Sequence, residues 1–524
     1  MLKVLTSDEM KEYDRYTMEE IGIPSASLME RAAYACADEA EKLLQKYGKG
    51  NGNAPEKSAG ILVVCGSGNN GGDGYACGRI LALRGFRVTF LAAGNPEHMS
   101  VEARRQEGIC RKLGMSILKD AEPNEYDLII DALFGIGLTR PVEGSYAVLI
   151  GKINDAGVPV LAVDIPSGIN ADSAEVMGCA VKAEATVTMQ YLKPGLLLAP
   201  GCRFAGKAVR ADIDVVAPDT LRNTDGPGIY TLSKEDLGML PARDPDGNKG
   251  SFGKLLVIAG NEEMAGAAFL SAAAALSAGA GMVRILTHKA NRDVLLTLLP
   301  EALLTIYTDE EDLLRKLPAA LSWSDAVVCG PGLGNSERTA ACLRYLLKAA
   351  ELPLILDADA LNALSGSAEL RSLLRKYRKD VIMTPHAGEM ARLCGQSITD
   401  VKRDPVRTAS SFAGEFGVTM VLKDSRTVTA GACGRSFINT SGNSGMATAG
   451  SGDVLSGILG ALCAGAHAEG NHFVPVEWND PVFLAAYGVL LHGCAGDEAQ
   501  QSVGQFGMKA RDLIEGLRGI LKKN

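Results

Sequence analysis

Short apolar runs rich in β-branched residues alternate with helical patterns along most of this chain. In the first half these runs lie at residues 61–65, 88–92, 128–131, 158–164 and 186–189. Several are apolar at every position, as strands covered by helices on both faces must be. Alternation at a spacing of roughly 30 residues predicts βαβ units around a parallel sheet, and the helical spacing before the first run predicts helices there.

The alternation pauses once, at residues 214–245, where proline and glycine are frequent. It resumes in the second half at residues 255–259, 283–286, 326–329, 354–357, 381–384 and 418–422. A chain of 524 residues exceeds what one hydrophobic core normally organises. The sequence therefore predicts two successive α/β domains, residues 1–222 and 228–524, with a linker at the pause.

The composition limits the kinds of partner. A net charge of −9 argues against a protein that coats nucleic acid, and the charged N-terminus argues against a signal peptide. Residues 265–283 are uncharged but consist mainly of Ala, Gly and Ser, which favours a buried helix over a membrane span. The twelve cysteines form no C-x-x-C pair. We therefore expect a cytoplasmic protein with free thiols, and no nucleic-acid partner, membrane partner or cysteine–histidine zinc site.

A glycine-rich segment directly follows the first apolar strand. Residues 66–74 contain five glycines, which let the backbone approach a ligand closely, and a helical pattern begins at residue 75. Free N–H groups at the start of that helix can bind phosphate. Asn69, Asn70 and Asp73 add oxygen atoms that suit a hard cation or ribose hydroxyls. The alternative is a simple tight turn.

Two further carboxylates stand where apolar strands end. Asp131 ends one strand and Asp164 another, and ligands of open parallel sheets bind at the carboxyl ends of the strands. Each aspartate alone is equally compatible with a helix cap or a turn. Three such positions on successive strands favour a site. Lys193 follows a further strand and can either pair with a carboxylate for proton transfer or lie in solvent.

The motifs of the first half resemble those of the NAD(P)H-hydrate epimerase domain. They are Asn-Asn-Gly-Gly-Asp at 69–73, Asp-Ala-Leu-Phe-Gly at 131–135 and Val-Asp-Ile-Pro-Ser-Gly at 163–168, and segments 5–10 and 22–30 resemble its N-terminal helices. The resemblance covers roughly residues 1–220 and implies a Rossmann-like three-layer αβα domain.

The same resemblance implies roles for individual residues. A potassium ion is implied near Asn70, Asp131 and Ser167, with Asp164 as the catalytic acid or base and Lys193 as its partner. The implied substrate contacts are Asn69, Asn70, Gly71, Gly72, Asp73, Gly135, Ile136, Gly137, Leu138, Thr139, Arg140, Pro141, Tyr146 and Asp164.

In the second half, Gly450, Ser451, Gly452 and Asp453 precede an apolar helical pattern. N–H groups and the dipole at the start of that helix can hold the charge on a transferring phosphoryl group. Asp453, in the first turn, can accept a proton from an attacking hydroxyl. The alternative, a helix N-cap with glycines for packing, accounts for one polar residue but not for the glycine-rich approach.

Further candidates follow other strands of the second half. Residues 330–334 are glycine-rich and allow a close backbone approach. Asp357 and Asp359 are candidates for direct or water-mediated metal contacts. His386 stands between proline and a small-residue segment at a strand end, and Lys423 ends the next strand, where an ammonium can meet a nucleotide phosphate.

These segments resemble the ADP-dependent NAD(P)H-hydrate dehydratase domain, a member of the ribokinase-like superfamily. Matches include Lys-Gly-Ser-Phe-Gly at 249–253, Thr-Pro-His-Ala-Gly-Glu at 384–389 and Gly-Ser-Gly-Asp at 450–453. The resemblance implies a ribokinase-like αβα domain that binds Mg²⁺ and ADP beside its substrate. The implied substrate contacts are Ala267, Gly332 and His386, and the implied nucleotide contacts are Lys423, Asp424, Ser425, Arg426, Thr427, Asn443, Gly450, Ser451 and Gly452. Asp424 departs from the family pattern, which favours glycine after the lysine.

The order of the two domains resembles fused bacterial repair enzymes and implies a reaction sequence. The first domain would interconvert the R and S hydrates of reduced nicotinamide cofactors, NADHX and NADPHX. In the second, Asp453 would deprotonate the ring hydroxyl of the S hydrate, which takes the terminal phosphate of ADP and is expelled, leaving NAD(P)H, AMP and phosphate. A homo-oligomer is also implied. Two alternatives are a small-molecule kinase with a nonenzymatic partner domain, and a first domain that only binds or scaffolds.

Overall fold

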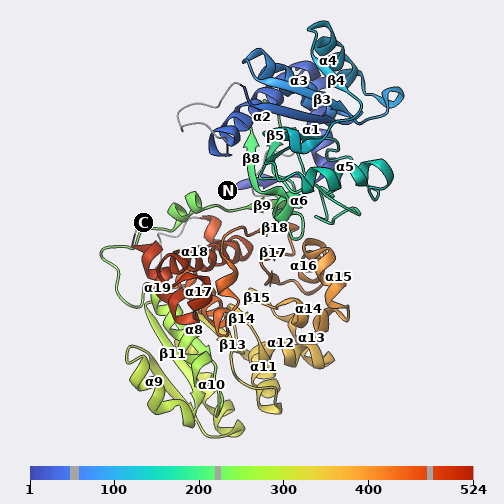
Figure 1. The fold of residues 1–524 in the computed structure, drawn as a ribbon. Helices are drawn as coiled ribbons and strands as arrows, with labels where there is room; N and C mark the ends of the chain where they lie inside the picture. Colours follow the sequence, from blue (N-terminus) through green and yellow to red (C-terminus); the bar gives the residue numbers. More distant parts are fainter. Residues whose placement is uncertain (48–57, 219–225, 469–475, 523–524) are drawn as a thin grey trace. The chain divides into compact units, whose positions relative to one another are not determined.

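The computed structural model describes residues 1–47, 58–218, 226–468 and 476–522. The chain forms two compact units, each with its own sheet (Figure 1). The N-terminal unit is Lys3–Thr224, and the C-terminal unit is Asp225–Asn524 together with Met1–Leu2. The two α/β folds confirm the predicted fold class.

The N-terminal unit is built on a seven-stranded sheet in the order β4-β3-β2-β5-β6-β7-β8, in which all neighbours are parallel. The five strands predicted from apolar runs are present, whereas the edge strands β4 and β8 were not predicted. Both edge strands are only partly buried, so they lack a continuous apolar run. The strands are β2 (Gly60–Cys65), β3 (Arg87–Ala92), β4 (Ser116–Leu118), β5 (Leu128–Ala132), β6 (Val160–Val163), β7 (Ala185–Met189) and β8 (Lys207–Ala211).

Helices cover both faces of this sheet. Ile61 and Val63 of β2 pack into a core with α2 and α3, while Leu62 and Val64 pack into a second core with α5. A central strand apolar on both faces is the pattern that predicted a parallel sheet. The helices are α1 (Ser7–Glu19), α2 (Ser25–Tyr47), α3 (Asn69–Leu83), α4 (Val101–Lys112), α5 (Gly144–Asp155), α6 (Pro194–Leu197) and α7 (Cys202–Ala205).

The helix after β2 begins earlier than the sequence predicts. The expectation of a start at residue 75 is wrong, because α3 begins at Asn69 and only residues 66–68 form the loop. Glycine disfavours a helix in isolation, but here it allows α3 to lie close to the sheet. A Cβ at Gly74 would lie 2.5 Å from Cβ of Ala132, and one at Gly78 would lie 2.4 Å from the ring of Phe90.

The C-terminal unit has an eleven-stranded sheet in the order β1-β9-β18-β17-β16-β15-β14-β13-β10-β11-β12. The strands from β16 to β12 in this order are parallel, and β17 pairs antiparallel with both β16 and β18. All six predicted strands are present, but β9 lies inside the stretch for which a linker was predicted. The strands are β1 (Leu2–Val4), β9 (Gly228–Thr231), β10 (Lys254–Ile258), β11 (Met282–His288), β12 (Leu303–Tyr307), β13 (Ala326–Cys329), β14 (Leu354–Leu356), β15 (Val381–Met383), β16 (Thr419–Leu422), β17 (Val428–Ala430) and β18 (Arg435–Ile438).

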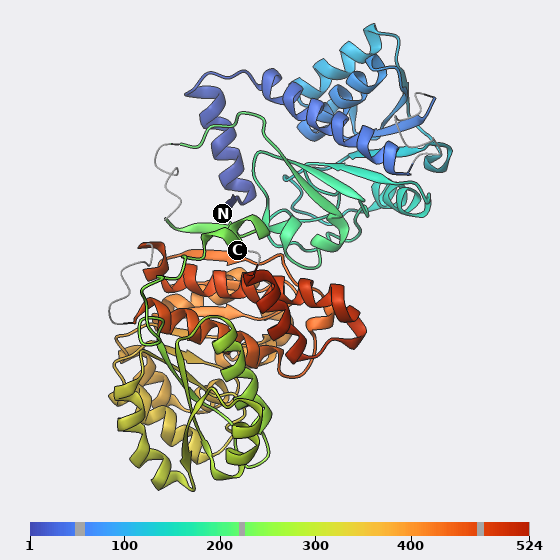
Figure 2. The ribbon, with the colours of Figure 1, turned by 90° about the vertical axis from the view of Figure 1, so that its left-hand side faces the viewer.

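Two helix layers flank this sheet (Figure 1). Helices α8, α17, α18 and α19 pack against one another on one side (Figure 2). The first layer comprises α8 (Ala265–Ser277), α17 (Ser451–Ala466), α18 (Pro481–Gly507) and α19 (Ala510–Leu521). The remaining helices are α9 (Arg292–Leu298), α10 (Glu310–Trp323), α11 (Glu337–Ala349), α12 (Asp359–Gly366), α13 (Ala368–Lys376), α14 (Ala387–Cys394), α15 (Ile398–Arg403) and α16 (Pro405–Phe416).

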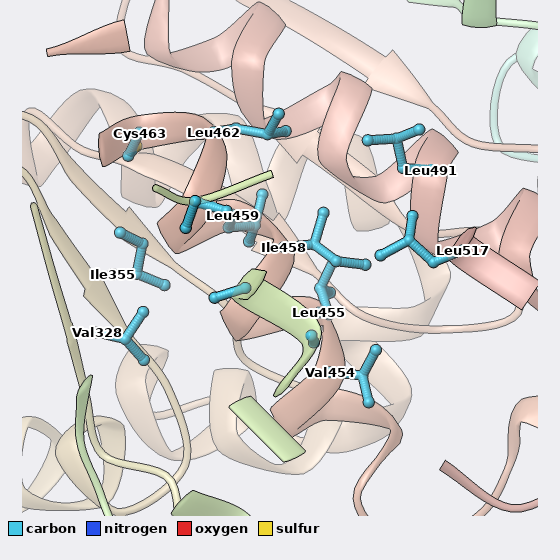
Figure 3. Packing of buried hydrophobic residues seen from close by; sticks show 14 of the residues in the cluster. Val328, Ile355, Val454, Leu455, Ile458, Leu459, Leu462, Cys463, Leu491 and Leu517 are labelled. Atoms are coloured by element: carbon cyan, nitrogen blue, oxygen red, sulfur yellow. The ribbon is translucent and has the colours of Figure 1, made fainter. Parts of the chain in front are cut away.

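Helix α17 is the centre of the C-terminal core. Its side chains Val454, Leu455, Ile458 and Leu459 lie among residues of the strands and of α18 and α19 (Figure 3). Its Gly457 faces α8 so closely that a Cβ would lie 2.1 Å from the carbonyl oxygen of Ser271. This close packing confirms a buried helix at the start of residues 265–283. Within the described ranges, every helix is too short or too polar to cross a bilayer.

Candidate functional sites

In each sheet, successive strands are added first on one side of a central strand and then on its other side, which makes one topological switch point. In the N-terminal unit, β3 and β4 lie on one side of β2, and the chain continues with β5 on the other side. In the C-terminal unit, β11 and β12 lie on one side of β10 and β13 on the other. Such switch points open a crevice at the carboxyl ends of the strands. Most predicted site residues lie on the loops or helix starts at this end of each sheet.

A pocket of about 540 Å³ lies at the first switch point. Its lining includes most residues for which a substrate contact was predicted: Asn69, Asn70, Asp73, Gly135, Ile136, Gly137, Leu138, Thr139, Arg140, Tyr146 and Asp164. Lys193, predicted as the partner of Asp164, lines it as well. Gly71, Gly72 and Pro141 were also predicted but do not line it. Gly71 and Gly72 instead pack against other residues of the same unit. A Cβ at Gly71 would lie 2.0 Å from the Gly66 carbonyl oxygen, and one at Gly72 would lie 2.7 Å from Cε of Met29.

Asp164 and Lys193 form a buried ion pair in this pocket. Nζ of Lys193 lies 2.5 Å from Oδ1 of Asp164, and it also donates to the hydroxyl of Thr188 at 2.8 Å and to the carbonyl of Met189 at 3.2 Å. The three acceptors satisfy an ammonium whose side chain is 0% exposed. Asp164 has a φ of 65°, a conformation that costs a non-glycine residue about 1–3 kcal/mol and is concentrated at functional sites.

Asp131 and Ser167 form a second buried group beside the pocket. Oδ1 of Asp131 accepts from the hydroxyl of Ser167 at 2.6 Å, and Oδ2 accepts from its backbone N–H at 2.8 Å. Burial raises the pKa of Asp131 in spite of these hydrogen bonds. Among the residues the structure describes, no cationic side chain pairs with it. The Phe134 N–H donates to the Ser167 hydroxyl at 2.8 Å, which ties the loop after β5 to this group.

Asn70 completes the potassium candidate. Its side chain is buried, and neither Oδ1 nor Nδ2 has a hydrogen-bond partner in the described part of the chain. A Cβ at Gly135 would lie 3.5 Å from Oδ1 of Asn70, so this amide faces the loop that carries Phe134. A buried carboxylate without a counter-charge and an orphaned amide oxygen both suit a monovalent cation, which supplies charge and accepts oxygen ligands.

At the second switch point, Gly332 and Ala267 lie side by side. A Cβ at Gly332 would lie 2.8 Å from that of Ala267, and Gly332 has a φ of 62°. The N–H of Gly260 donates to the carbonyl of Pro331 at 2.9 Å, which joins the loops after β10 and β13. The two predicted substrate contacts are therefore brought together by the ends of neighbouring strands.

Asp357, Lys423 and Ser456 form a charged network at the ends of β14 and β16. Nζ of Lys423 lies 2.8 Å from Oδ1 of Asp357, and the hydroxyl of Ser456 donates to Oδ2 at 2.5 Å. Both oxygens of Asp357 are thus engaged by the protein, so this carboxylate positions Lys423 and α17. Burial lowers the pKa of Lys423, but Asp357, Glu389 and Asp453 outweigh it and raise that pKa.

Helix α17 begins at the predicted glycine-rich segment. Gly450 caps it with a φ of 89°, and the first-turn N–H groups have no carbonyl within the helix to bond. Lys423 points at this turn, since a Cβ at Gly452 would lie 3.3 Å from its Nζ. Burial, together with Asp357, raises the pKa of Asp453 to about 7. A carboxyl with such a pKa, beside helix N-terminal N–H groups that suit a phosphate, can act as a general base.

His386 is held by the start of α14. Its Nδ1 accepts from the N–H groups of Gly388 and Glu389, at 2.9 and 3.3 Å, and Glu389 Oε2 accepts from the His386 N–H at 2.8 Å. Neutral His386 therefore carries its proton on Nε2, at the end of a side chain that is 56% exposed. The Lys423 N–H donates to the Pro385 carbonyl at 2.8 Å. This bond fixes Pro385, the residue before His386, beside Lys423.

The other predicted nucleotide contacts have local partners. Asp424 pairs with Lys402 at 3.2 Å, Arg426 donates to the Thr440 carbonyl at 2.6 Å, and Thr427 donates to the Asp424 carbonyl at 3.1 Å. Ser425 donates its N–H to the side chain of Asp424 at 2.7 Å. The Asn443 amide is hydrogen-bonded within the protein at both its atoms. Nδ2 donates to the Gly496 carbonyl and to Asp497, and Oδ1 accepts from the Gly445 N–H. The Asp424 carboxylate is thus compensated by Lys402.

Sequence reasoning missed two residues near the start of α17. Ser456 gave no signal, because a serine inside an apolar helix is common. His492, in the middle of α18, donates from Nε2 to the Ser451 carbonyl at 3.0 Å. Burial lowers the pKa of His492 to about 4, so it is neutral at pH 7 and serves as a fixed donor to the glycine-rich turn. A histidine within a long apolar pattern was the available signal.

Two family models match the chain, one described as YjeF-related protein N-terminus over residues 25–195 and one described as NAD(P)H-hydrate dehydratase over residues 255–518. The bifunctional NAD(P)H-hydrate repair enzyme Nnr of Moorella thermoacetica is 35% identical over 537 residues, which cover 99% of this chain and 96% of that protein. Its namesake from Escherichia coli is 36% identical over 463 residues, 88% and 84% of the two chains. The structure of an ADP/ATP-dependent NAD(P)H-hydrate dehydratase from Bacillus subtilis, co-crystallised with ATP and Mg²⁺, is 27% identical, covers 57% of this chain and 99% of its own, and has a TM-score of 0.47.

Proposed function

Since the chain belongs to the family of bifunctional NAD(P)H-hydrate repair enzymes, we propose that its two sites act in turn on one damaged cofactor. The N-terminal unit epimerises the R and S hydrates of NADH and NADPH, and the C-terminal unit dehydrates the S hydrate at the expense of ADP. The observation that carries this function is the position of Asp453 in the first turn of α17, at the helix N-terminus and near Lys423. This arrangement suits transfer of a phosphoryl group to a hydroxyl.

In the N-terminal pocket, Asp164 is the proposed acid or base. Lys193 holds its Oδ1, so the other carboxylate oxygen is directed to the substrate. In the described ranges Oδ2 makes no hydrogen bond within the chain. A potassium ion would be held by Asn70, Asp131 and Ser167. Its charge would offset the buried carboxylate of Asp131, and its binding would stabilise the loop after β5, which is bonded to Ser167 through the Phe134 N–H.

In the C-terminal site, Asp453 takes the proton from the ring hydroxyl of the S hydrate. The hydroxyl oxygen then attacks the terminal phosphorus of ADP while the first-turn N–H groups of α17 and Lys423 stabilise the phosphoryl oxygens. Loss of the phosphorylated hydroxyl restores the reduced ring and leaves AMP and phosphate. The preference for ADP is itself part of the proposal.

Mg²⁺ would accompany the nucleotide and would not sit in a protein cage. Both oxygens of Asp357 are engaged by Lys423 and Ser456, and Asp359 Oδ2 accepts from the Gly334 N–H at 2.8 Å. Mg²⁺ commonly keeps its waters and binds through substrate phosphates and one or two carboxylates. Asp357 or Asp359 would supply that carboxylate, directly or through water, since each carboxylate oxygen keeps a second lone pair. The ion supplies positive charge to the phosphate oxygens.

The deciding experiment supplies the purified protein with a mixture of the two NADHX epimers, with and without ADP and Mg²⁺. With ADP, both epimers should disappear as near-ultraviolet absorbance of the reduced ring returns in step with AMP. Without ADP, only the ratio of epimers should move. Accumulation of a stable phosphorylated hydrate would instead support a kinase, and a fixed epimer ratio would support a first domain that only binds.

The dehydratase should depend on pH through Asp453. Its carboxyl must be ionised to accept a proton, and its pKa is raised to about 7. We therefore expect kcat/KM for the S hydrate to rise with pH through about 7 and then to level. The Asp453→Asn variant should lose this rise. A wild-type profile that is flat between pH 5.5 and pH 8.5, roughly 1.5 units either side of that value, would contradict the assignment of Asp453 as the base.

The epimerase should require potassium. Replacing K⁺ with a bulky organic cation should lower epimerase activity, and titration with KCl should raise the melting temperature of the N-terminal unit. Ser167→Ala removes a donor to Asp131 and should weaken K⁺ binding by roughly 10- to 100-fold in the same titration. Ser173→Ala changes a partly exposed serine whose hydroxyl donates to Glu175, and it is the matched control. An equal response in all cations would argue against a bound K⁺.

A homo-oligomer and a cytoplasmic location stay predictions, as does the absence of a nucleic-acid partner.

A further inference from the structure

The N-terminal pocket contains an acidic residue that no motif revealed. Asp14 lies on α1 and lines the pocket together with Asp164 and Lys193. Met10 and Met18 stand one helical turn before and after it and line the same pocket. The three residues form one stripe of α1, so the Asp14 carboxyl projects from a largely apolar surface into the space that holds the Asp164–Lys193 pair.

Helix α1 is held firmly enough to fix the position of Asp14. Thr6 and Glu9 close a capping box at its start. The Ser7 N–H and hydroxyl donate to the two oxygens of Asp172, at 2.6 and 2.5 Å, and Asp172 follows Asp164 in the loop after β6. On the opposite side Thr17 accepts from the Val216 N–H at 3.0 Å.

Asp14 differs from the other acids of α1 because it is unpaired. Glu12 is paired with Arg15, and Asp8 is paired with Lys11. Within the described ranges, Asp14 has neither a hydrogen bond nor an ion pair, although it is half buried. A half-buried carboxyl that contributes nothing to the local structure and faces a pocket is placed for a ligand.

The charged groups that line the pocket with Asp14 come from five parts of the fold. Asp164 directly follows β6, Lys193 caps α6, Asp73 lies in the second turn of α3, Arg140 is in the loop after β5, and Lys11 is on α1 itself; the residues of α2 that line the pocket are uncharged. Burial and then the Asp164 charge raise the pKa of Asp14 to about 6, partly offset by Lys193. Burial also raises the pKa of Asp73 well above its usual range, and Asp164 and Asp14 add to this rise.

We propose that Asp14 is a second catalytic acid–base group of the epimerase, which exchanges a proton with the substrate at a different atom from Asp164. The proposal rests on the epimerase function proposed above. Inversion of a carbon that carries a hydroxyl and a ring nitrogen requires that carbon to become planar. One carboxylate cannot accept the hydroxyl proton and protonate the ring nitrogen at the same time. Two carboxyl groups in different environments can divide these roles.

The proton movements balance without an oxidant or a second substrate. Asp164, ionised beside Lys193, takes the hydroxyl proton; the carbon–oxygen bond becomes a carbonyl as the carbon–nitrogen bond breaks, with its electron pair going to the ring nitrogen. Asp14, in its acid form, protonates that nitrogen. After rotation about the adjacent carbon–carbon bond, the nitrogen attacks the other face of the carbonyl, returns its proton to Asp14, and the oxygen regains the proton held by Asp164.

The test compares Asp14→Asn with wild type in full-length protein. We expect the epimerase kcat to fall by roughly 10²- to 10⁴-fold with KM changed by no more than about threefold. In wild type, kcat/KM should fall as pH rises through about 6, because Asp14 must be protonated to donate. Asp14→Asn should lose that fall, and Asp14→Glu should restore it together with part of the activity. Glu12→Gln, on the exposed side of α1, should behave as wild type.

Two controls separate this proposal from folding and from the proposed function. Dehydration of the purified S hydrate by Asp14→Asn should equal wild type, and the melting temperature should be unchanged or higher, since an unpaired half-buried acid is removed. Wild-type epimerase activity with unchanged pH dependence in Asp14→Asn would overturn the role of Asp14. A wild-type protein that does not exchange the epimers would instead overturn the epimerase function.

Discussion

Replacing Asp453 with asparagine is expected to stop the dehydratase while leaving the epimerase intact. Asparagine keeps the shape of the side chain but cannot accept the hydroxyl proton, and general bases contribute roughly 10²- to 10⁴-fold to a rate. We therefore expect a fall of that size in kcat for ADP-dependent recovery of NADH, measured on purified S hydrate. The KM for ADP should change little, because the first-turn N–H groups and Lys423 remain in place.

Two comparisons make the Asp453 result specific. Asp293→Asn removes an acid whose side chain is 92% exposed in the same unit and should leave both activities unchanged. In Asp453→Asn itself, a mixture of epimers should still reach its equilibrium ratio at the wild-type rate. Retention of more than about one tenth of wild-type kcat would show that another group takes the proton.

The parts of the fold that follow from local pattern were predictable. Strand β2 and its neighbours bury side chains on both faces, and that burial requires the continuous apolar runs seen in the sequence. Strand β9 escaped notice because it lies in a proline-rich stretch and is held by pairing with β18, a partner about 200 residues away. The early start of α3 escaped notice because tertiary packing overrides the low helix propensity of glycine.

The same division applies to the sites. The glycine-rich start of α17 and the acids at strand ends were predictable, since backbone geometry and residue type together specify what they can bind. The partners of Asp357 were not predictable, because only the structure places Lys423 and Ser456 on its two oxygens. Asp14 was not predicted as a site residue, because an acid on an amphipathic helix is ordinarily solvated. Only the structure shows that Asp14 and its neighbours Met10 and Met18 on α1 line the pocket.

Breaking the ion pair between Asp164 and Lys193 should have the second large effect, on stability as well as on catalysis. In Asp164→Ala the ammonium of Lys193 loses its counter-charge at a position that is 0% exposed. Removing one partner of a buried pair typically costs about 3–5 kcal/mol, so the free energy of unfolding of the N-terminal unit should fall by that amount. Epimer exchange should be lost as well, because Asp164 is the proposed acid or base.

The composition of the chain allows this loss to be assigned to one unit. Both tryptophans, Trp323 and Trp478, lie in the C-terminal unit, so tryptophan fluorescence reports on that unit alone. In Asp164→Ala, circular dichroism should show an early transition in denaturant that tryptophan fluorescence does not follow. Dehydration of the S hydrate should persist until the later transition.

The double variant Asp164→Leu with Lys193→Met separates the two roles of the pair. Replacing both charges with apolar groups removes the uncompensated ammonium, and such replacements of a buried pair are often neutral or stabilising. We therefore expect the double variant to regain most of the stability that Asp164→Ala loses while it still fails to exchange the epimers. A stable double variant with wild-type epimerase activity would remove Asp164 from the mechanism. A double variant as unstable as Asp164→Ala would show that the hydrogen bonds to Thr188 and Met189, not the charge pair, hold this part of the pocket together.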